Sequence, residues 1–431
     1  MSRTLGPLQI DSLAYGGKGV ARADGKVIFV AGGVPGDRVI CRLSREKKRF
    51  AEAELVELVE ASAIRRRPPC PVADQCGGCQ WQQLPYPEQC RWKELTFADL
   101  LLRQAGVPRE LILPIMPAPG EWNYRSRVQF KCFHYQGRFL TGFYRPNSHF
   151  VVDIDNCPVV ANELNRVLVQ LKSVLSGSPS AAVVPQIDMA LGADQQVRVV
   201  IHALSGQQDI KELCRPLAEQ NGFSLFLQSG RKETLQPVFG SSGLPIEVDE
   251  PPLRLEYGAG GFAQINLQQN RCLVDAVIES ARLSGTEQVL DLFCGMGNFS
   301  LPLARRAAHV VAVEEYPLSI DYGKKNAKAN GIRNVTFLCQ ASEGFLCTGK
   351  GTRHFDLVLL DPPRSGAYAI MPELLRHRPQ RIIYISCDPA TLARDLKFLL
   401  HGGYRLVSTR PFDMFPQTYH IESLTVLELD S

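Results

Sequence analysis

One cysteine near the C-terminal end has the surroundings of a nucleophile. Cys387 follows the apolar run RIIYIS and precedes PATLARDL, so it lies where a strand is expected to end and a helix to begin. The dipole and free N–H groups of a helix N-terminus stabilise a thiolate, the reactive form of cysteine. A lone cysteine is more commonly a buried structural residue, but Ser386, Asp388 and Pro389 are polar or turn-forming and favour exposure. We therefore expect a reactive thiol here.

A carboxylate downstream could serve that thiol as a base. Covalent catalysis by sulfur needs a group that removes a proton before the sulfur can leave. In FPQTYHIESLTVLEL, Glu422 begins the final apolar run. An ordinary strand carboxylate is the alternative interpretation, and the presence of Cys387 favours the base.

A second group of residues predicts a ligand site. DLFCGMGN, residues 291–298, closes one apolar run, and its glycines allow a tight turn and a close approach of the backbone to a ligand. Glu314 ends the next run, where a carboxylate can bind ribose hydroxyl groups, and Asp361 ends a later run as part of DPPR. A GxG turn alone also fits a nicotinamide or flavin dinucleotide, but the third glycine of that fingerprint is absent.

These elements together resemble a class I S-adenosylmethionine methyltransferase. The resemblance implies that Phe293, Asn298, Glu314 and Asp361 line the methyl donor, and that Gln340 lies near its adenine. DPP motifs also occur in N-methyltransferases, which need no nucleophile. The cysteine described above is what distinguishes the two chemistries.

One sheet could position all of these side chains. From about residue 285, apolar runs alternate with amphipathic helical stretches; the runs are EQVLDLF, HVVAVEE, NVTFL, FDLVLLD, RIIYIS, YRLVS and SLTVLEL. This alternation predicts an α/β, doubly wound, mostly parallel sheet. Ligands of such sheets lie beyond the carboxyl ends of the strands, which is where the residues above fall. We assign residues 261–431 to this Rossmann-like domain.

The rest of the chain divides into two further predicted domains. Residues 1–62 contain short alternating runs separated by glycine turns, a pattern typical of a small OB-like β-barrel. The stretch YGGKGVARADGKVIFVAGGVPGDRV resembles the TRAM domain, a barrel associated with RNA binding. Residues 63–260 are predicted to form a middle α/β domain, in which a helix over about 86–106 could pack on the catalytic domain.

Basic residues are concentrated near the barrel. Arg45, Lys47, Lys48 and Arg49 lie within five positions, and three arginines follow at 65–67. A solvated surface and an RNA-binding surface are equally compatible with such a run. The net charge of +4 does not decide between them.

A cluster of cysteines could hold a metal. Cys70, Cys76 and Cys79 need a fourth ligand, for which Cys157 is the best candidate; Cys90, in the predicted helix, is the nearest rival. The spacing is equally compatible with zinc and with an iron–sulfur cluster. Disulfides are disfavoured in a chain without a recognisable signal peptide.

Five motifs in order, GGFAQINLQQN, DLFCGMGNFSL, DPPRSG, YISCDPATLARD and FPQTYHIE, resemble the RNA 5-methyluridine methyltransferase family over essentially the whole chain. The resemblance implies methyl transfer from S-adenosylmethionine to carbon 5 of a uracil. Cys387 would be the nucleophile, Glu422 the proton acceptor and Gln264 a contact of the methyl donor. The resemblance further implies that Arg125, Arg127 and Phe262 contact the flipped uracil or its backbone. An aromatic face commonly holds an unstacked base.

The same resemblance bears on metal and substrate. Ribosomal members carry a [4Fe–4S] cluster on this cysteine arrangement, which makes zinc the weaker choice and 23S rRNA the expected substrate. A tRNA uridine methyltransferase, an inactive RNA-binding iron–sulfur protein and an N-methyltransferase are the alternatives. Two departures from the family pattern stand out: Asp388 replaces a common asparagine, and Glu315 duplicates the strand-end acid. A carboxylate beside Cys387 is expected to raise the pKa of its thiol.

Composition fits this interpretation. The chain has 45% hydrophobic and 21% charged residues, no secretory signal and no apolar run of membrane-spanning length. We expect a cytoplasmic, RNA-binding monomer that does not contact membranes.

Overall fold

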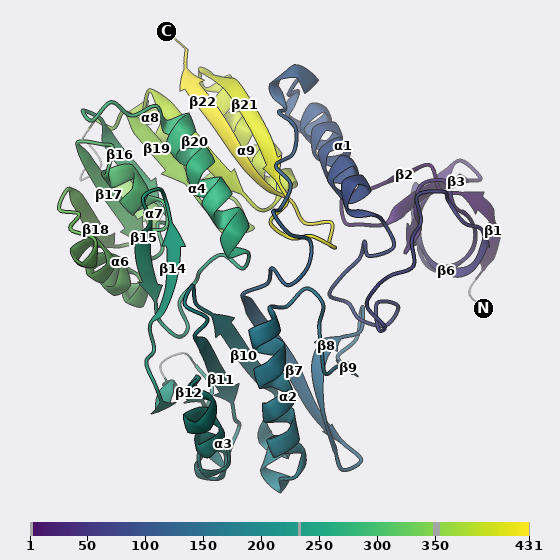
Figure 1. Cartoon of the computed structure of the whole chain (residues 1–431). Helices are drawn as coiled ribbons and strands as arrows, with labels where there is room; N and C mark the ends of the chain where they lie inside the picture. Colours follow the sequence, from purple (N-terminus) through teal and green to yellow (C-terminus); the bar gives the residue numbers. More distant parts are fainter. Residues whose placement is uncertain (1–2, 232–233, 348–353, 431) are drawn as a thin grey trace.

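The computed structural model describes residues 3–231, 234–347 and 354–430 and contains three large sheets along the chain (Figure 1). Within these residues, no helix combines the length and apolar character needed to span a bilayer. None of the thirteen cysteines, all of which are described, forms a disulfide.

The N-terminal sheet curls into a barrel (Figure 1). Its strands are β1 (Thr4–Gln9), β2 (Ser12–Leu13), β3 (Gly19–Ala23), β4 (Lys26–Ala31), β5 (Arg38–Glu46) and β6 (Phe50–Glu60). Their order is β1-β5-β6-β4-β3-β2, and β4 pairs with β6 in parallel. Alternate apolar residues of these strands, among them Ile28, Val30 and Val39, fill the interior, which explains the alternating runs of the sequence.

A long connection leads from the barrel to helix α1 (Tyr86–Ala105). The helix ends at Gly106, which has φ of 69° and whose N–H donates to the last carbonyls; this agrees with the helix expected over about 86–106. A short 3₁₀ helix, η1 (Arg109–Leu111), follows. Phe97 and Leu101 of α1 share a core with Leu392 and Leu396 of the C-terminal domain, so α1 packs on that domain.

The middle sheet has the order β13-β12-β11-β10-β7-β8-β9. Its elements are β7 (Arg127–Tyr135), β8 (Arg138–Tyr144), β9 (Val151–Asp153), α2 (Asn162–Ser176), η2 (Pro179–Val183), β10 (Gln186–Leu191), β11 (Val197–His202), α3 (Gln207–Asn221), β12 (Ser224–Gln228) and β13 (Gln236–Phe239). Leu164, Leu168 and Leu171 recur at helical spacing in α2 and are buried against the sheet.

The C-terminal sheet has the order β18-β17-β16-β19-β20-β22-β21. Its elements are α4 (Leu267–Ala281), β16 (Gln288–Leu292), α5 (Ser300–Ala304), β17 (His309–Glu314), α6 (Pro317–Ala329), β18 (Val335–Cys339), α7 (Ser342–Cys347), β19 (Leu357–Leu360), η4 (Tyr368–Ile370), α8 (Met371–His377), β20 (Arg381–Ser386), α9 (Pro389–His401), β21 (Tyr404–Phe412) and β22 (Glu422–Leu429). Strands β16 to β20 pair in parallel, whereas β22 is antiparallel to both neighbours.

Both faces of this sheet are covered by helices. Helices α4, α5 and α6 contribute to the core on one face, and α1, α7, α8 and α9 to the core on the other. Neighbouring residues therefore face opposite cores, as Val289 and Leu290 do, which accounts for continuous apolar runs instead of alternation.

Two segments that precede residue 260 also belong to this core. The hairpin of β14 (Leu244–Val248) and β15 (Leu253–Tyr257) packs its apolar side chains with those of α4 and α6. Ile112 and Met116 form isolated bridges with Thr409 and Phe412 at the edge of the sheet. The C-terminal sheet is thus bordered by chain from outside the predicted limits of its domain.

Candidate active site

The loops that follow β16 to β19 lie side by side at one edge of the C-terminal sheet. The backbone N–H of Cys294 donates to Val313, that of Gln340 to Glu314, and that of Asp361 to Leu292, at 3.1, 3.0 and 3.4 Å. The predicted cofactor residues on these loops are therefore gathered at one strand-end edge, the usual ligand site of such sheets.

The turn after β16 is shaped by residues with left-handed backbone. Phe293 has φ of 65°, a conformation that costs a side-chain-bearing residue energy and is found at functional sites. Gly297 has φ of 96°, and a Cβ there would lie 3.1 Å from Leu301. Between them the N–H of Gly295 donates to Glu314 at 3.3 Å, so the turn is fixed against the acid of the neighbouring strand.

Three carboxyl groups lie close enough at this edge to influence one another's ionisation. Burial, and then the charges of neighbouring carboxylates, raises the pKa of Asp291 to about 8 although the Ser300 hydroxyl donates to it. Burial and the charge of Glu314 raise the pKa of Asp361 to about 7. Glu314 also accepts the N–H of Tyr316 at 2.9 Å. The site therefore favours a ligand that brings positive charge and hydroxyl donors.

The segment before α4 lies beside this turn. Asn270 of α4 and Asn298 exchange two side-chain hydrogen bonds, of 2.8 and 3.0 Å. Gln264, in the segment leading into α4, is buried. Phe262, two residues earlier, is 61% exposed, so the same short segment offers one buried polar side chain and one exposed aromatic ring.

Arg127 holds that segment in place. Its guanidinium donates to the carbonyls of Gly261 and Ala263 at 3.0 and 2.9 Å and lies 5.6 Å from the Phe262 ring. Arg125 donates in turn to the carbonyl of Arg127 at 3.0 Å. Both arginines were predicted to contact RNA; in this structure their guanidinium groups contact protein backbone.

Cys387 lies between the end of β20 and the start of α9, as predicted, and is partly buried. A backbone N–H at this helix start lowers the pKa of the thiol, as expected, but the net shift is upward. Burial, followed by the charges of Glu422 and Asp361, raises the pKa of the thiol to about 12, and Arg364 opposes this shift. Desolvation and two nearby carboxyl groups outweigh the helix N-terminus.

The carboxylate of Asp388 has a structural role at the start of α9. Its side chain caps α9, accepting the N–H groups of Ala390 and Thr391 at 2.9 and 3.0 Å. The hydroxyl of Tyr15, from the barrel, donates to it at 3.2 Å. The barrel thus contacts the residue next to Cys387, a contact that sequence analysis missed because the two residues are 373 positions apart.

Glu422 begins β22 and is 3% exposed. Burial and the charge of Asp361 raise the pKa of this carboxyl group well above its usual range, and Arg364 opposes the shift. Cys387, Glu422 and Asp361 therefore form one electrostatic group, and Arg364 is a cation of this group that sequence analysis did not identify.

The four predicted metal ligands line a common cavity of about 250 Å³, together with Arg364 and His420; they are Cys70, Cys76, Cys79 and Cys157. Among the residues that the structure describes, no group of three or more histidine, cysteine or acidic side chains has an arrangement that could hold a metal ion. Cys90 lies on α1. Lys47 and Lys48 are exposed in the turn between β5 and β6 of the barrel.

Comparison with known proteins agrees with this geometry. The family model described as tRNA (uracil-5-)-methyltransferase matches residues 115–429, and the TRAM domain model matches residues 7–56. A crystal structure of Pyrococcus abyssi tRNA (uracil-54, C5)-methyltransferase in complex with S-adenosyl-L-homocysteine is similar with a TM-score of 0.77 and 26% identity. It covers 99% of this chain and 100% of the other. The predicted fold, a class I methyltransferase domain with an N-terminal barrel and a middle α/β region, is confirmed.

Curated relatives match over nearly the whole length. A protein of Alkalilimnicola ehrlichii named 23S rRNA (uracil(1939)-C(5))-methyltransferase RlmD is 36% identical over 98% of this chain and 96% of its own. An uncharacterized RNA methyltransferase of Thermosynechococcus vestitus is 35% identical over 97% of both chains.

Proposed function

Because this chain belongs to the tRNA (uracil-5-)-methyltransferase family, we propose that it transfers a methyl group from S-adenosylmethionine to carbon 5 of a uridine in 23S rRNA. The observation that carries the chemistry is the electrostatic group of Cys387, Glu422 and Asp361 at the strand-end edge. An N-methyltransferase would have no use for a thiol and a second buried acid at that place.

The strand-end loops supply the methyl donor site in this proposal. Glu314 receives the ribose hydroxyl groups, and Asp361 and Asn298 lie around the remaining polar groups. Phe293 and Gln340 flank the adenine, and Gln264 approaches from the opposite segment; this assignment of roles extends the positions described above. The acidic edge supports it, because S-adenosylmethionine carries a positive sulfonium and amine.

The thiol and the acid divide the reaction into two steps. Carbon 5 of uracil is a poor nucleophile, so the Cys387 thiol first loses its proton to solvent and the thiolate bonds to carbon 6, which turns the C5–C6 double bond into an enolate. Carbon 5 of the enolate then attacks the methyl group, the bond between methyl and sulfonium sulfur breaks, and S-adenosylhomocysteine is the leaving group. Glu422 then takes the proton from carbon 5, the electron pair of that C–H bond forms the double bond between carbons 5 and 6, and the C–S bond breaks. Glu422 must be ionised to take this proton, and its raised pKa then makes the carboxylate a stronger base than one in water.

The resting state of the site protects the thiol. Its pKa of about 12 means that the thiolate is a minor form before RNA is bound, so side reactions of the sulfur are slow. We expect the thiolate to form when the uracil displaces water and Arg364 turns towards the developing negative charge.

The choice of ribosomal RNA rests on the relatives and on the barrel. The names of these relatives specify a uracil of 23S rRNA, and the TRAM-like barrel adds an exposed pair of lysines, Lys47 and Lys48. A uridine in tRNA is the alternative, favoured by the name of the Pyrococcus abyssi structure.

We also propose that the cysteine-lined cavity takes a [4Fe–4S] cluster. Four cysteines from two distant segments line one cavity, and cysteine thiolates are the usual ligands of such a cluster. Zinc also takes four cysteine ligands, and the family resemblance is what favours the cluster over zinc. The cluster would cross-link residues 70–79 to Cys157. Iron and sulfide content after anaerobic purification, compared with a Cys157→Ala variant, tests this.

RNA containing 5-fluorouridine tests the catalytic proposal. Fluorine at carbon 5 blocks proton removal, so methyl transfer should leave a denaturation-resistant adduct between protein and RNA. We expect an adduct with 23S rRNA and S-adenosylmethionine, none with Cys387→Ser, and an adduct on ordinary RNA with Glu422→Gln. Methyl transfer to ordinary RNA without any adduct on the fluorinated RNA would refute the covalent mechanism. An adduct with tRNA alone would refute the ribosomal substrate.

A further inference from the structure

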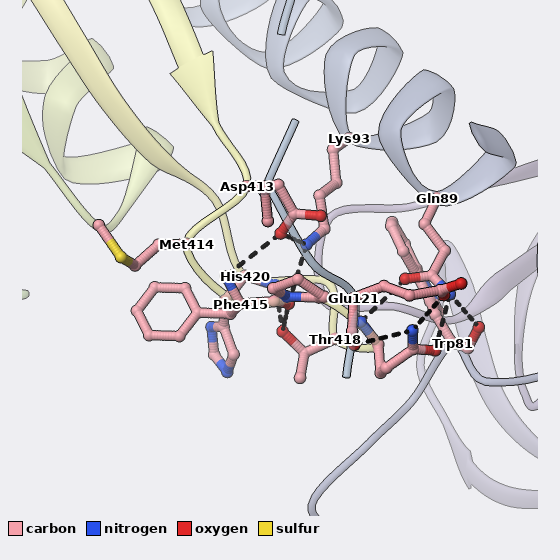
Figure 2. Close-up of polar contacts among 12 residues, drawn as sticks. Trp81, Gln89, Lys93, Glu121, Asp413, Met414, Phe415, Thr418 and His420 are labelled. Carbon is pink, nitrogen blue, oxygen red and sulfur yellow. Dashed lines mark hydrogen bonds and ion pairs between the residues drawn. The ribbon is translucent and has the colours of Figure 1, made fainter. Parts of the chain in front are cut away.

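The loop that leads into Glu422 is held by residues from outside the C-terminal sheet. Residues 413–421 join β21 to β22, and α1 and the segment before it surround this loop (Figure 2). We propose that Gln417, at the centre of the loop, is a positioning residue that places Glu422 for proton removal. The proposal rests on the role proposed above for Glu422.

The Gln417 side chain bridges two polar side chains of the N-terminal half. Its Oε1 accepts from Nε2 of Gln89 at 2.9 Å, and its Nε2 donates to Oε2 of Glu121 at 2.8 Å. Arg66 reinforces the bridge, since its guanidinium lies 3.3 Å from Gln417 Oε1 and 3.4 Å from Glu121 Oε2. The side chain is fully buried, so these contacts replace its hydration.

The backbone of Gln417 is held as well. Its N–H donates to Gln89 Oε1 at 2.8 Å, and its carbonyl accepts the N–H groups of Gln80 and Trp81 at 3.1 and 3.0 Å. These two donors directly follow Cys79. Gln417 also has φ of 70°, a strained conformation for a residue with a side chain. Such a conformation is kept only where surrounding contacts hold the backbone in place.

An ion pair fixes the start of the loop. Lys93 of α1 donates to Asp413 Oδ1 at 2.6 Å and to the carbonyl of Phe415 at 3.0 Å (Figure 2). Both charged side chains have no solvent exposure. The hydroxyl of Thr418 donates to the same Phe415 carbonyl at 2.8 Å. The loop is therefore tied at residues 413, 415, 417 and 418.

These ties act on Glu422 more directly than on Cys387, whose neighbour Ser386 is bonded by Ser423, the residue after Glu422. Glu422 follows the loop directly, whereas Cys387 is held by β20 and by the capped start of α9. Loss of the Gln417 contacts should therefore shift the base relative to the adduct and leave the nucleophile in place. A base misplaced by about 1 Å can slow its step on the order of 10²-fold.

A charge exchange tests this without changing the size of either side chain. Gln417→Glu places a carboxylate against Glu121, and the double variant Gln417→Glu/Glu121→Gln restores a donor and an acceptor in reversed order. In the single variant we expect turnover on ordinary RNA to fall roughly 10²-fold with KM for RNA unchanged, and methylated adduct to accumulate. Deuterium at carbon 5 of the uracil should reduce the turnover of Gln417→Glu more than that of the wild type. The double variant should regain the turnover of the wild type.

Adduct formation on 5-fluorouridine RNA provides the discriminating measurement, because it does not need the base. Gln417→Glu should form that adduct at the wild-type rate. Equal slowing of adduct formation and turnover, or a double variant as impaired as the single one, would overturn the proposal. If the wild type itself forms no adduct, the proposed function fails instead.

Two further variants guard against a folding defect. Gln417→Met keeps the volume and removes the side-chain hydrogen bonds, so it should reproduce the kinetic pattern if Gln417→Glu does not fold. Gln208→Ala, on the surface of α3 and bonded to Glu212, is the matched control and should behave as the wild type.

Discussion

Removing the charge of Lys93 should destabilise the protein strongly. Lys93→Met retains most of the buried volume but leaves the Asp413 carboxylate without a cation. That carboxylate has no solvent exposure, and its Oδ2 already lacks a hydrogen-bond partner in the described structure. Loss of one partner of a buried pair costs about 3–5 kcal/mol, against about 0–1 kcal/mol for a surface pair. The Phe415 carbonyl also loses its ammonium donor, so we expect the upper half of the larger range.

Urea unfolding measures this directly. The midpoint should fall with an unchanged slope, because the surface exposed on unfolding is the same. Lys93→Met/Asp413→Leu should be more stable than Lys93→Met alone, since it leaves no buried charge unpaired. A loss of less than about 1 kcal/mol in Lys93→Met, or a double variant less stable than the single one, would refute this reasoning.

Three other predictions concern the thiol and the RNA surfaces. Arg364→Gln removes a charge that lowers the pKa of Cys387, so iodoacetamide at pH 8 should alkylate this cysteine more slowly. Peptide mass spectrometry follows the reaction, and faster alkylation would contradict the expected effect of Arg364 on the thiol pKa. Phe262→Ala should weaken RNA binding by about 1–3 kcal/mol if the exposed ring stacks on a base, and an unchanged affinity in titrations would exclude stacking. Lys47→Ala/Lys48→Ala should reduce the slope of log affinity against log salt by roughly 1–2, and an unchanged slope would place the RNA away from this turn.

Sequence periodicity predicted the C-terminal sheet well. Strands β17, β19 and β20 are nearly continuous apolar runs because both faces of the sheet are covered there, and the loops with Glu314 and Asp361 follow from where the runs of β17 and β19 stop. Cys387 was placed correctly between β20 and α9 by the same argument. Local sequence is sufficient where a backbone pattern alone decides the position of a side chain.

The electrostatic state of the site could not be predicted in this way. The pKa of Cys387 depends on Glu422 and Asp361, which arrive from other strands, and on burial. Asp388 was expected to act on the thiol, and its side chain also caps α9. Gln417 lies within the FPQTYHIE motif, but the sequence does not show its role, because its side-chain partners Gln89 and Glu121 come from the N-terminal half of the chain. The proposed cofactor and RNA contacts stay predictions.

The contact between Lys93 and Asp413 joins residues 320 positions apart, and this has a consequence for protein synthesis. The ribosome delivers a chain from its N-terminus, so the barrel can close early, whereas α1 emerges long before its counter-charge exists. A nascent chain that stops before residue 413 therefore carries Lys93 without its counter-charge, and α1 must wait for about three hundred further residues before the loop that leads into Glu422 can be tied to it.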